Sequence, residues 1–298
     1  MNGEATLPLG SNWGPVHLSV TDLERAKLFW TRYVGLEQTA EPASLGVGGR
    51  TLIVLHPDAT APVTPRRTGL YHVALHVTNR RELALVIARL HSLRYQNSPT
   101  DHTMSETTYL WDPDGHGIEI TLETPERGAF VQLPGGGFAA RRTDGTITSG
   151  RDPVDLDSLF AELDEGEDLL RPLAPGTRVG HVHLHVADLA ASRAFYRDVI
   201  GFELVNHEVL MQMSDFAFPG VAFKHSLAIN TWSGVNAPPP PPGTASLRSF
   251  TLVLPTQAGV SALVERLHAA GHPFEESGRE LRLADPSGNV LLVQPADS

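Results

Sequence analysis

The chain has 298 residues, of which 41% are hydrophobic and 19% are charged, so it is long enough for two globular domains of ordinary size. Its net charge of −11 argues against a nucleic-acid partner and against docking on an anionic membrane, because both need a basic surface. It contains no cysteine, which excludes disulfides, thiolate metal sites and cysteine nucleophiles.

The N-terminal residues MNGEATLPLGSNWG lack a basic segment followed by an apolar one, and no apolar run is long enough to span a membrane. We therefore expect a cytoplasmic protein. With 14 histidines and no cysteine, any metal site must be built mainly from His, Asp and Glu.

The first predicted elements, in residues 14–37, are a short strand and an amphipathic helix. Apolar side chains at positions 23, 26, 29, 30 and 33 recur at helical spacing, so one face of this helix should pack on a sheet. Asp22 stands where a helix N-terminus needs an acceptor, and Gly35 suits a helix C-terminus.

A second strand, LYHVALHV (70–77), is followed by a helix that contains ARLHS (88–92) and by the strand-rich stretch DPDGHGIEI (112–120). Residues 125–178 then carry loop and turn signals, PGGG at 134–137 and TDGTITSGRDP at 143–153. A short helix is expected at 155–163.

The second half of the chain repeats the first. GHVHLHVADLAASRAFYRDVIGFE (180–203) matches GPVHLSVTDLERAKLFWTRYVGLE (14–37), LRSFTLVL (247–254) matches 70–77, and DPSGNVLLV (285–293) matches 112–120. We predict an α+β protein with four βαβββ modules paired into two cup-shaped mixed β-sheet domains. The predicted ranges are 1–125 for an N-terminal metal-binding domain, 126–178 for a linker, and 179–298 for a C-terminal pseudo-repeat domain. The proline-rich segment 236–243 should be an extended connector.

Polar residues that differ between the copies indicate function. His17 matches His183, but His72 matches Ser249 and Glu119 matches Leu292. A carboxylate buried in an apolar strand is costly unless it is paired or binds a cation. We therefore predict metal ligation by His17, His72 and Glu119, the residue types of a facial triad that leaves coordination positions open. These types suit iron, manganese, zinc or nickel. The remaining strand and helix histidines are interpreted as surface or structural: His76, His91, His181, His185 and His268.

The chain resembles the vicinal oxygen chelate superfamily, which includes glyoxalase I, bleomycin-resistance proteins and extradiol dioxygenases. Within it, the stretch HTMSETTYLWDPDGHGIE resembles the extradiol dioxygenase signature. Thr108 departs from that signature, which has an apolar residue there. The matching residues are His102, Tyr109, Asp112, Pro113, Gly115 and Glu119.

This resemblance implies a metal-dependent extradiol dioxygenase that cleaves a catechol-type aromatic substrate with dioxygen. Fe(II) is the expected metal and Mn(II) the alternative. Tyr109 could hydrogen-bond the catecholate or be a packed strand tyrosine, and His102 could stabilise dioxygen or move a proton, or be a solvent-exposed loop residue. His56, in LIVLHP, is a candidate acid–base group or a strand-end histidine. A homodimer is compatible with the superfamily.

Many extradiol enzymes keep the metal in the C-terminal domain, whereas here the predicted triad lies in the N-terminal half. The C-terminal half keeps His183 and His225, and whether its pocket has a function is left open. The sequence allows two other functions. A glyoxalase or isomerase would need a second glutamate at the end of the first module, where LIVLHP stands. A non-catalytic small-ligand or antibiotic-binding protein would bind its ligand tightly without oxygen uptake.

Overall fold

The fold is described from a computed structural model for residues 6–133 and 137–296, so the predicted turn at 134–136 lies outside the described residues. The first module comprises β1 (Asn12–Ser19), α1 (Leu23–Leu28), η1 (Phe29–Val34), β2 (Glu37–Gln38), β3 (Ser44–Val47) and β4 (Arg50–His56). The second comprises β5 (Gly69–His76), α2 (Arg80–Ser92), β6 (Ser98–Asp101), β7 (Ser105–Trp111) and β8 (Gly117–Glu123).

The third module comprises β13 (Arg178–His185), α4 (Leu189–Ala194), η3 (Phe195–Ile200), β14 (Glu203–Glu208), β15 (Met213–Ala217) and β16 (Leu227–Asn230). The fourth comprises β17 (Ser246–Leu254), α5 (Gln257–Ala269), β18 (Phe274–Ser277), β19 (Glu280–Ala284) and β20 (Val290–Pro295). The predicted α+β class and the four repeated modules are confirmed.

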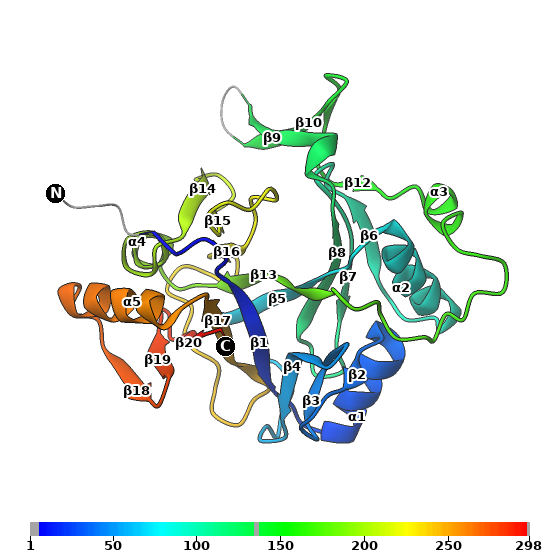
Figure 1. The fold of residues 1–298 in the computed structure, drawn as a ribbon. Coiled ribbons are helices and arrows are strands. Elements are labelled where there is room, and N and C mark those ends of the chain that lie inside the picture. The colour runs from blue at the N-terminus through cyan, green and yellow to red at the C-terminus, as the bar shows by residue number, and fades with distance from the viewer. Residues whose placement is uncertain (1–5, 134–136, 297–298) are drawn as a thin grey trace.

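Two large mixed sheets organise these modules (Figure 1). One has eight strands in the order β18-β19-β20-β17-β1-β4-β3-β2, and the other has nine in the order β12-β6-β7-β8-β5-β13-β16-β15-β14. Each sheet therefore joins one module from each half of the chain: the first pairs with the fourth, and the second with the third. This corrects the expectation that consecutive modules pair within 1–125 and within 179–298. Those boundaries stay a prediction, since each sheet takes strands from both ranges.

The two connectors between modules explain this exchange, because each carries the chain from one sheet to the other. Residues 57–68 join β4 to β5, and residues 231–245, which include the predicted extended segment, join β16 to β17. The connectors lie side by side: Thr60 N donates to Gly243 O over 2.7 Å, Thr68 N donates to Pro238 O over 3.1 Å, and Ala61 bridges to Thr244.

Local signals place the helices as predicted. The Asp22 side chain accepts from Arg25 N, and the Asp188 side chain accepts from Ala190 N and Ala191 N, so both aspartates cap helix N-termini. Each helix ends in a π-helical turn, η1 or η3, closed by a glycine in the left-handed region, with φ of 97° at Gly35 and 100° at Gly201.

The core runs between the two sheets. Trp13 of β1 is fully buried and its indole donates to Ser226 O, immediately before β16 of the other sheet, over 2.7 Å. Its ring packs on Phe202, Phe218 and Phe250, with centroids 5.2–5.7 Å apart. Such buried aromatic contacts stabilise the packing of one sheet on the other.

The segment between the halves is not a plain linker. It contains η2 (Pro125–Arg127), the hairpin β9 (Gly128–Gln132) and β10 (Phe138–Arg142), β11 (Ile147–Thr148), β12 (Asp152–Pro153) and α3 (Leu156–Phe160). Strands β9–β11 form a separate small sheet, and β12 joins the edge of the nine-stranded sheet through β6. The helix predicted at 155–163 is confirmed as the shorter α3.

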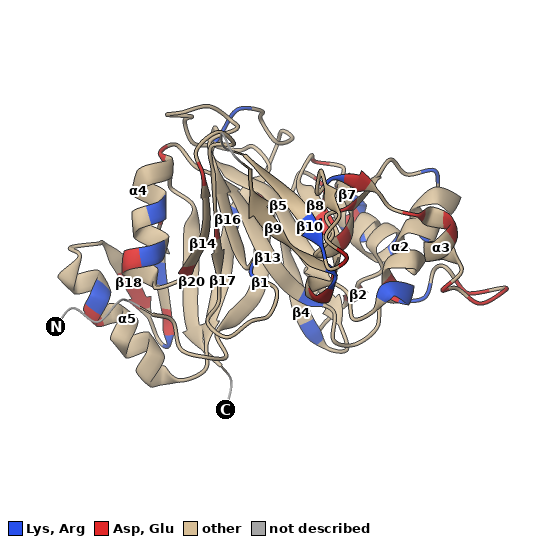
Figure 2. Cartoon of the chain, turned by 90° about the horizontal axis from the view of Figure 1, so that it is seen from above, with Lys and Arg blue, Asp and Glu red and all other residues tan. Residues whose placement is uncertain are grey.

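Charge is mixed over the outer elements. Figure 2 shows Lys and Arg interspersed with Asp and Glu around α2 and α3. Among the described residues, no helix is long and apolar enough to cross a membrane.

Candidate metal centre and its cavity

Strand register in the nine-stranded sheet brings three polar side chains to one face. Ala74 of β5 is paired with His181 of β13 on one side and with Glu119 of β8 on the other. His72 precedes Ala74 by two residues, so it points to the same face. The small Ala74 side chain leaves space between its two polar neighbours.

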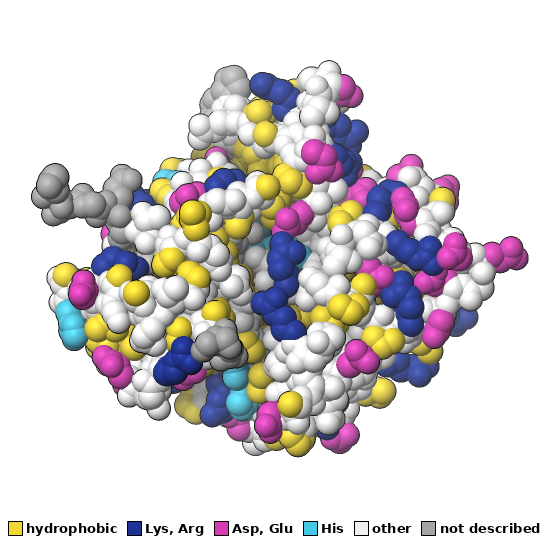
Figure 3. Space-filling model, in the orientation of Figure 1, with side chains coloured by type: hydrophobic (Ala, Val, Ile, Leu, Met, Phe, Trp, Pro, Cys, Tyr) yellow, Lys and Arg dark blue, Asp and Glu magenta, His cyan; other side chains and the backbone are white. Residues whose placement is uncertain are grey.

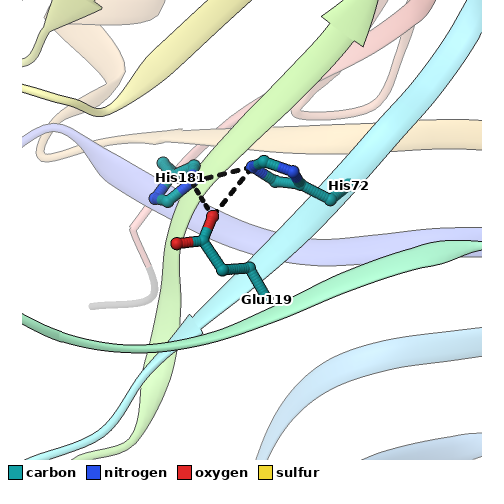
Figure 4. A group of neighbouring side chains, drawn as sticks. All are labelled: His72, Glu119 and His181. Atoms are coloured by element: carbon teal, nitrogen blue, oxygen red, sulfur yellow. Dashed lines mark hydrogen bonds and ion pairs between the residues drawn. The ribbon is translucent and has the colours of Figure 1, made fainter. Parts of the chain in front are cut away.

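Three ligand-type atoms converge at this point (Figure 4). His72 Nε2, His181 Nε2 and Glu119 Oε2 lie 3.0 Å from one another in all three pairs. All three residues are buried, with exposed fractions of 5%, 1% and 3% for His72, His181 and Glu119. A buried carboxylate flanked by two imidazoles is a donor set that binds divalent metals.

The three atoms are close enough together to be ligands of one metal ion. Two imidazoles and one carboxylate would hold such an ion and leave its other positions open for exogenous ligands.

The electrostatics of the group favour a cation. Burial alone would raise the pKa of Glu119, but His181 and His72 hold that pKa well below its usual range, so the carboxylate is ionised. Burial lowers the pKa of His181 well below its usual value, so its imidazole is neutral, as metal ligation requires.

A hydrogen-bonded chain behind His181 fixes which of its nitrogens faces the site. The Glu123 carboxylate lies 2.6 Å from His76 Nδ1, which must donate to it, and His76 Nε2 is therefore left as an acceptor 2.9 Å from His181 Nδ1. His181 Nδ1 donates to His76, so the lone pair of His181 Nε2 is free to bind a cation held together with His72 Nε2 and Glu119 Oε2. Gly180 makes room for this chain, because a Cβ there would lie 1.9 Å from the His76 ring.

The two signature residues lie beside this group. His102 Nδ1 donates to Gly150 O over 2.6 Å, so its Nε2 is the acceptor for the Tyr109 hydroxyl at 3.0 Å. Tyr109 of β7 is paired with Glu119 of β8. Burial raises the pKa of Tyr109 well above its usual value, helped by the Glu119 charge, and burial lowers the pKa of His102. Both side chains are therefore uncharged near neutral pH.

His17 and His56 lie elsewhere, which corrects the predicted grouping. They belong to β1 and β4 of the eight-stranded sheet, where His17 Nδ1 lies 3.0 Å from His56 Nε2. Strand β1 pairs with β17 rather than with β5, so His17 is opposite Ser249 and not near His72 or Glu119. Neither histidine lines the cavity described below. Burial lowers the pKa of His17 to about 4, with further lowering by His56 and Arg248.

His181 and His76, interpreted from sequence as surface or structural, are instead buried at the site. The signal for His181 is present in the repeat: at the offset of 166 residues, His181 aligns with Pro15. This is the same kind of difference that identified Glu119 against Leu292. His76 carries a similar signal, because it aligns with the apolar Val253 when 70–77 is matched with 247–254.

His183 and His225, two histidines of the C-terminal half with no assigned role, face the same site. His183 is opposite His72, and its Nε2 accepts from Asn230 Nδ2 over 2.7 Å. The His225 ring packs edge-on against His181 with centroids 4.4 Å apart, and its Nδ1 lies 3.2 Å from Asp215 Oδ1. Burial opposes protonation of His225, but Asp215 raises its pKa above the usual value. The two halves of the chain therefore share one centre.

A cavity of about 840 Å³ opens from this centre. Around the metal group it is lined by hydrogen-bonding side chains, which are Tyr71, His102, Tyr109, His183, Asp215 and His225. Further out, apolar side chains form its walls: Trp111, Phe130, Phe138, Leu210, Met211, Met213 and Trp232. Large, partly apolar cavities with a few convergent polar groups are typical of small-molecule sites.

Two sequence comparisons show which family the chain belongs to. A family model described as "Glyoxalase/Bleomycin resistance protein/Dioxygenase superfamily" matches residues 13–120 and 178–293. The chain is 34% identical to a Bacillus subtilis (strain 168) protein named "Catechol-2,3-dioxygenase" over 286 residues, covering 94% of this chain and 95% of that protein.

Among solved structures, a putative dioxygenase from Bacillus subtilis superposes with a TM-score of 0.63 at 10% identity, covering 99% of this chain and 87% of that one. Glyoxalase I from Zea mays superposes with a TM-score of 0.57 at 14% identity, covering 96% and 92%. At these identities the structural likenesses concern the fold alone.

Proposed function

Because the chain belongs to the glyoxalase/bleomycin resistance protein/dioxygenase superfamily, we propose that it is a metal-dependent extradiol dioxygenase that cleaves a catechol-type aromatic ring beside its two hydroxyls. The observation that carries the proposal is the group of His72, Glu119 and His181, with ligand atoms 3.0 Å apart on one face. The 34% identical relative bears the name of such an enzyme.

The metal would be held by His72, Glu119 and His181, with Fe(II) expected and Mn(II) as the alternative. When bound, a metal of this kind supplies Lewis-acid binding for the two hydroxyl oxygens of the diol and the redox chemistry that dioxygen requires. The donor set fits either ion, because imidazole and carboxylate ligands suit both.

Tyr109 and His102 would act on the substrate's protons. With the pKa of Tyr109 raised by burial, its hydroxyl stays protonated, and its oxygen can accept a hydrogen bond from a substrate hydroxyl while its proton is donated to His102 Nε2. His102 Nε2 faces that hydroxyl as an acceptor, so a proton can pass from a substrate hydroxyl to Tyr109 O as the Tyr109 proton moves to His102 Nε2. His56 lies in the other sheet, so this mechanism uses His102 and Tyr109 and leaves His56 out.

The first test is metal content after anaerobic purification, by elemental analysis, on wild type and three variants. We expect near-stoichiometric metal in wild type and in His17→Ala, and its loss in Glu119→Ala and His181→Ala. His17→Ala is the matched control, because it removes a strand histidine from the other sheet. Metal retained in His181→Ala would overturn the ligand assignment.

The second test is oxygen uptake with catechol, together with absorbance of the ring-opened product. We expect turnover by wild type, and a large loss of rate in His102→Ala with metal retained. Tight catechol binding without oxygen uptake by the metal-loaded protein would overturn the proposed reaction and favour a non-catalytic ligand-binding protein.

A further inference from the structure

The turn between β6 and β7 presents His102 to the site through an unusual backbone conformation. The turn residues are His102, Thr103 and Met104, and His102 N donates to Ser105 O over 2.8 Å. Thr103 follows His102 directly and has a φ of 72°, in the left-handed region. That region is sterically unfavourable for a residue with a branched Cβ, so the turn holds backbone strain next to a site residue.

Thr103 keeps this conformation because its neighbours bind it from several sides. Its N–H donates to Asp101 Oδ1 over 2.7 Å, and its carbonyl accepts from Thr124 Oγ1 over 2.9 Å. Its hydroxyl lies 3.4 Å from the Thr148 hydroxyl, and a Cβ on Gly128 would lie only 2.8 Å from its methyl carbon. The whole side chain is buried. Strained backbone persists only where the surrounding structure over-determines it, as these contacts do.

Most of these contacts come from the segment between the two halves of the chain. Gly128 is the first residue of β9, and Thr148 is the last residue of β11. Arg127 of η2 donates to Asp101 Oδ2 over 2.6 Å, which fixes the carboxylate that binds Thr103 N. Figure 3 shows Lys and Arg side chains next to Asp or Glu side chains at the base of the β9–β10 hairpin. The segment is therefore anchored where it supports the turn.

The same segment also holds the His102 ring. Gly150 O accepts from His102 Nδ1 over 2.6 Å, which leaves Nε2 as the acceptor for the Tyr109 hydroxyl. Gly150 N donates to Thr148 Oγ1 over 3.2 Å. The Thr148 hydroxyl thus contacts both Thr103, which follows His102 in the turn, and Gly150, which binds the His102 ring.

A change of backbone at Thr103 would disturb this arrangement. An ordinary negative φ there would alter the direction of the chain between His102 and Met104, and with it the position of the His102 ring. Hydrogen bonds weaken steeply with distance and angle, so the bonds to Gly150 O and Tyr109 tolerate little displacement. Without the Gly150 acceptor, nothing would keep the proton of the neutral ring on Nδ1.

We propose that Thr103 is a positioning residue, whose left-handed backbone keeps the His102 ring between Gly150 O and the Tyr109 hydroxyl. The segment between the halves, through Thr148 and Gly150, holds both the turn and the ring. The effect on catalysis rests on the proposed function, whereas the placement of the ring does not depend on any reaction.

The test compares two substitutions that a packing role and a backbone role rank in opposite order. Thr103→Gly adopts a left-handed φ without strain but removes the buried methyl and hydroxyl groups. Thr103→Val keeps the shape and the strain, and loses the hydroxyl that contacts Thr148. We expect kcat within about threefold of wild type for Thr103→Gly, and kcat about tenfold lower with unchanged KM for Thr103→Val, because a misplaced proton acceptor slows the chemical step alone.

The matched control is Thr107→Val, which should leave kcat unchanged. Thr107 is a fully buried threonine of β7 that does not line the cavity. Circular dichroism and metal content check that each variant folds. If Thr103→Val does not fold, Thr148→Val replaces it, because it removes the same hydroxyl contact without changing the turn, and the same loss of kcat is expected.

A spectroscopic measurement separates this inference from the proposed reaction. Nuclear magnetic resonance of metal-free protein labelled in the histidine ring nitrogens reports which nitrogen carries the proton, and the His102 signals are those that disappear in His102→Gln. We expect the Nδ1–H form in wild type, Thr103→Gly and Thr107→Val, and a mixture of both forms in Thr103→Val. This result without turnover of any catechol by the wild type would uphold the positioning role and reject the dioxygenase. Wild-type signals and wild-type kcat in Thr103→Val, or a larger loss of kcat in Thr103→Gly than in Thr103→Val, would overturn the inference and leave the reaction standing.

Discussion

Replacing His76 by phenylalanine should weaken metal binding although His76 is not a ligand. In wild type, His76 accepts from His181 Nδ1 over 2.9 Å and donates to Glu123 over 2.6 Å, which keeps the lone pair of His181 Nε2 on the metal side. Phenylalanine has a similar shape but no acceptor, so the competing tautomer, with the proton on His181 Nε2, is no longer disfavoured.

The expected loss follows from that one contact. A hydrogen bond in a charge-assisted chain contributes about 1.5–3 kcal/mol. At about 1.4 kcal/mol per factor of ten, this lowers metal affinity roughly 10- to 100-fold, the range found when a partner of a ligating histidine is replaced. We expect the same direction for Gly180→Ala, whose Cβ would lie 1.9 Å from the His76 ring and displace it.

The assay is anaerobic calorimetric titration of the metal-free protein with Mn(II), with circular dichroism as the check of folding. His91→Phe is the control, because His91 is an exposed histidine on α2 and does not line the cavity. A His76→Phe protein that folds normally and binds Mn(II) within threefold of wild type would refute the role of His76 in orienting His181.

Three further predictions concern single side chains. Glu119→Leu introduces the residue type that the second copy of the repeat has at Leu292, and it should abolish metal binding. In urea titrations of the metal-free protein, the unfolding free energy should stay unchanged or rise by about 1–4 kcal/mol, because a buried carboxylate is replaced by an apolar side chain. A loss of several kcal/mol would contradict this. Tyr109→Phe should lower kcat about 100-fold with Mn(II) affinity within threefold of wild type, whereas an unchanged kcat would remove Tyr109 from the mechanism. His17, whose folded pKa of about 4 lies below the usual 6.5, takes up a proton in the unfolded chain first, so stability should fall as pH decreases from about 6.5 to 4. The full pKa shift corresponds to about 3.4 kcal/mol of unfolding free energy, which solvent screening of the partly exposed ring reduces to about 1–2 kcal/mol. Urea titrations at pH 7 and pH 4.5 should show that His17→Gln loses this part of the acid sensitivity.

The modules themselves could be predicted from the sequence because their signals are local. The caps at Asp22 and Asp188 and the left-handed glycines Gly35 and Gly201 act within one turn of a helix. Periodic apolar residues then identify which face of each element is buried. These features do not depend on which module lies next to which.

The pairing of modules could not be predicted, because the first strand of every module offers a similar edge. Whether His72 lies opposite His183 or His17 depends on the course of the connectors at 57–68 and 231–245, which carry no partner-specific pattern. The identification of His72 and Glu119 as site residues came from differences within the repeat. The strand partners place His181 of β13, and not His17 of β1, beside these two residues.

The exchange of modules between sheets also determines when the centre can form during synthesis. His72 and Glu119 are made in the first half of the chain, but β5 keeps an open eight-residue edge until β13 emerges with His181. A nascent chain that ends near residue 125 has neither a complete sheet nor a complete ligand set. The same holds for β1, which waits for β17 near the C-terminus. The N-terminal half alone therefore lacks one member of the ligand group, and two separately expressed halves would have to associate through the β5–β13 pair before His72, Glu119 and His181 could bind a metal together.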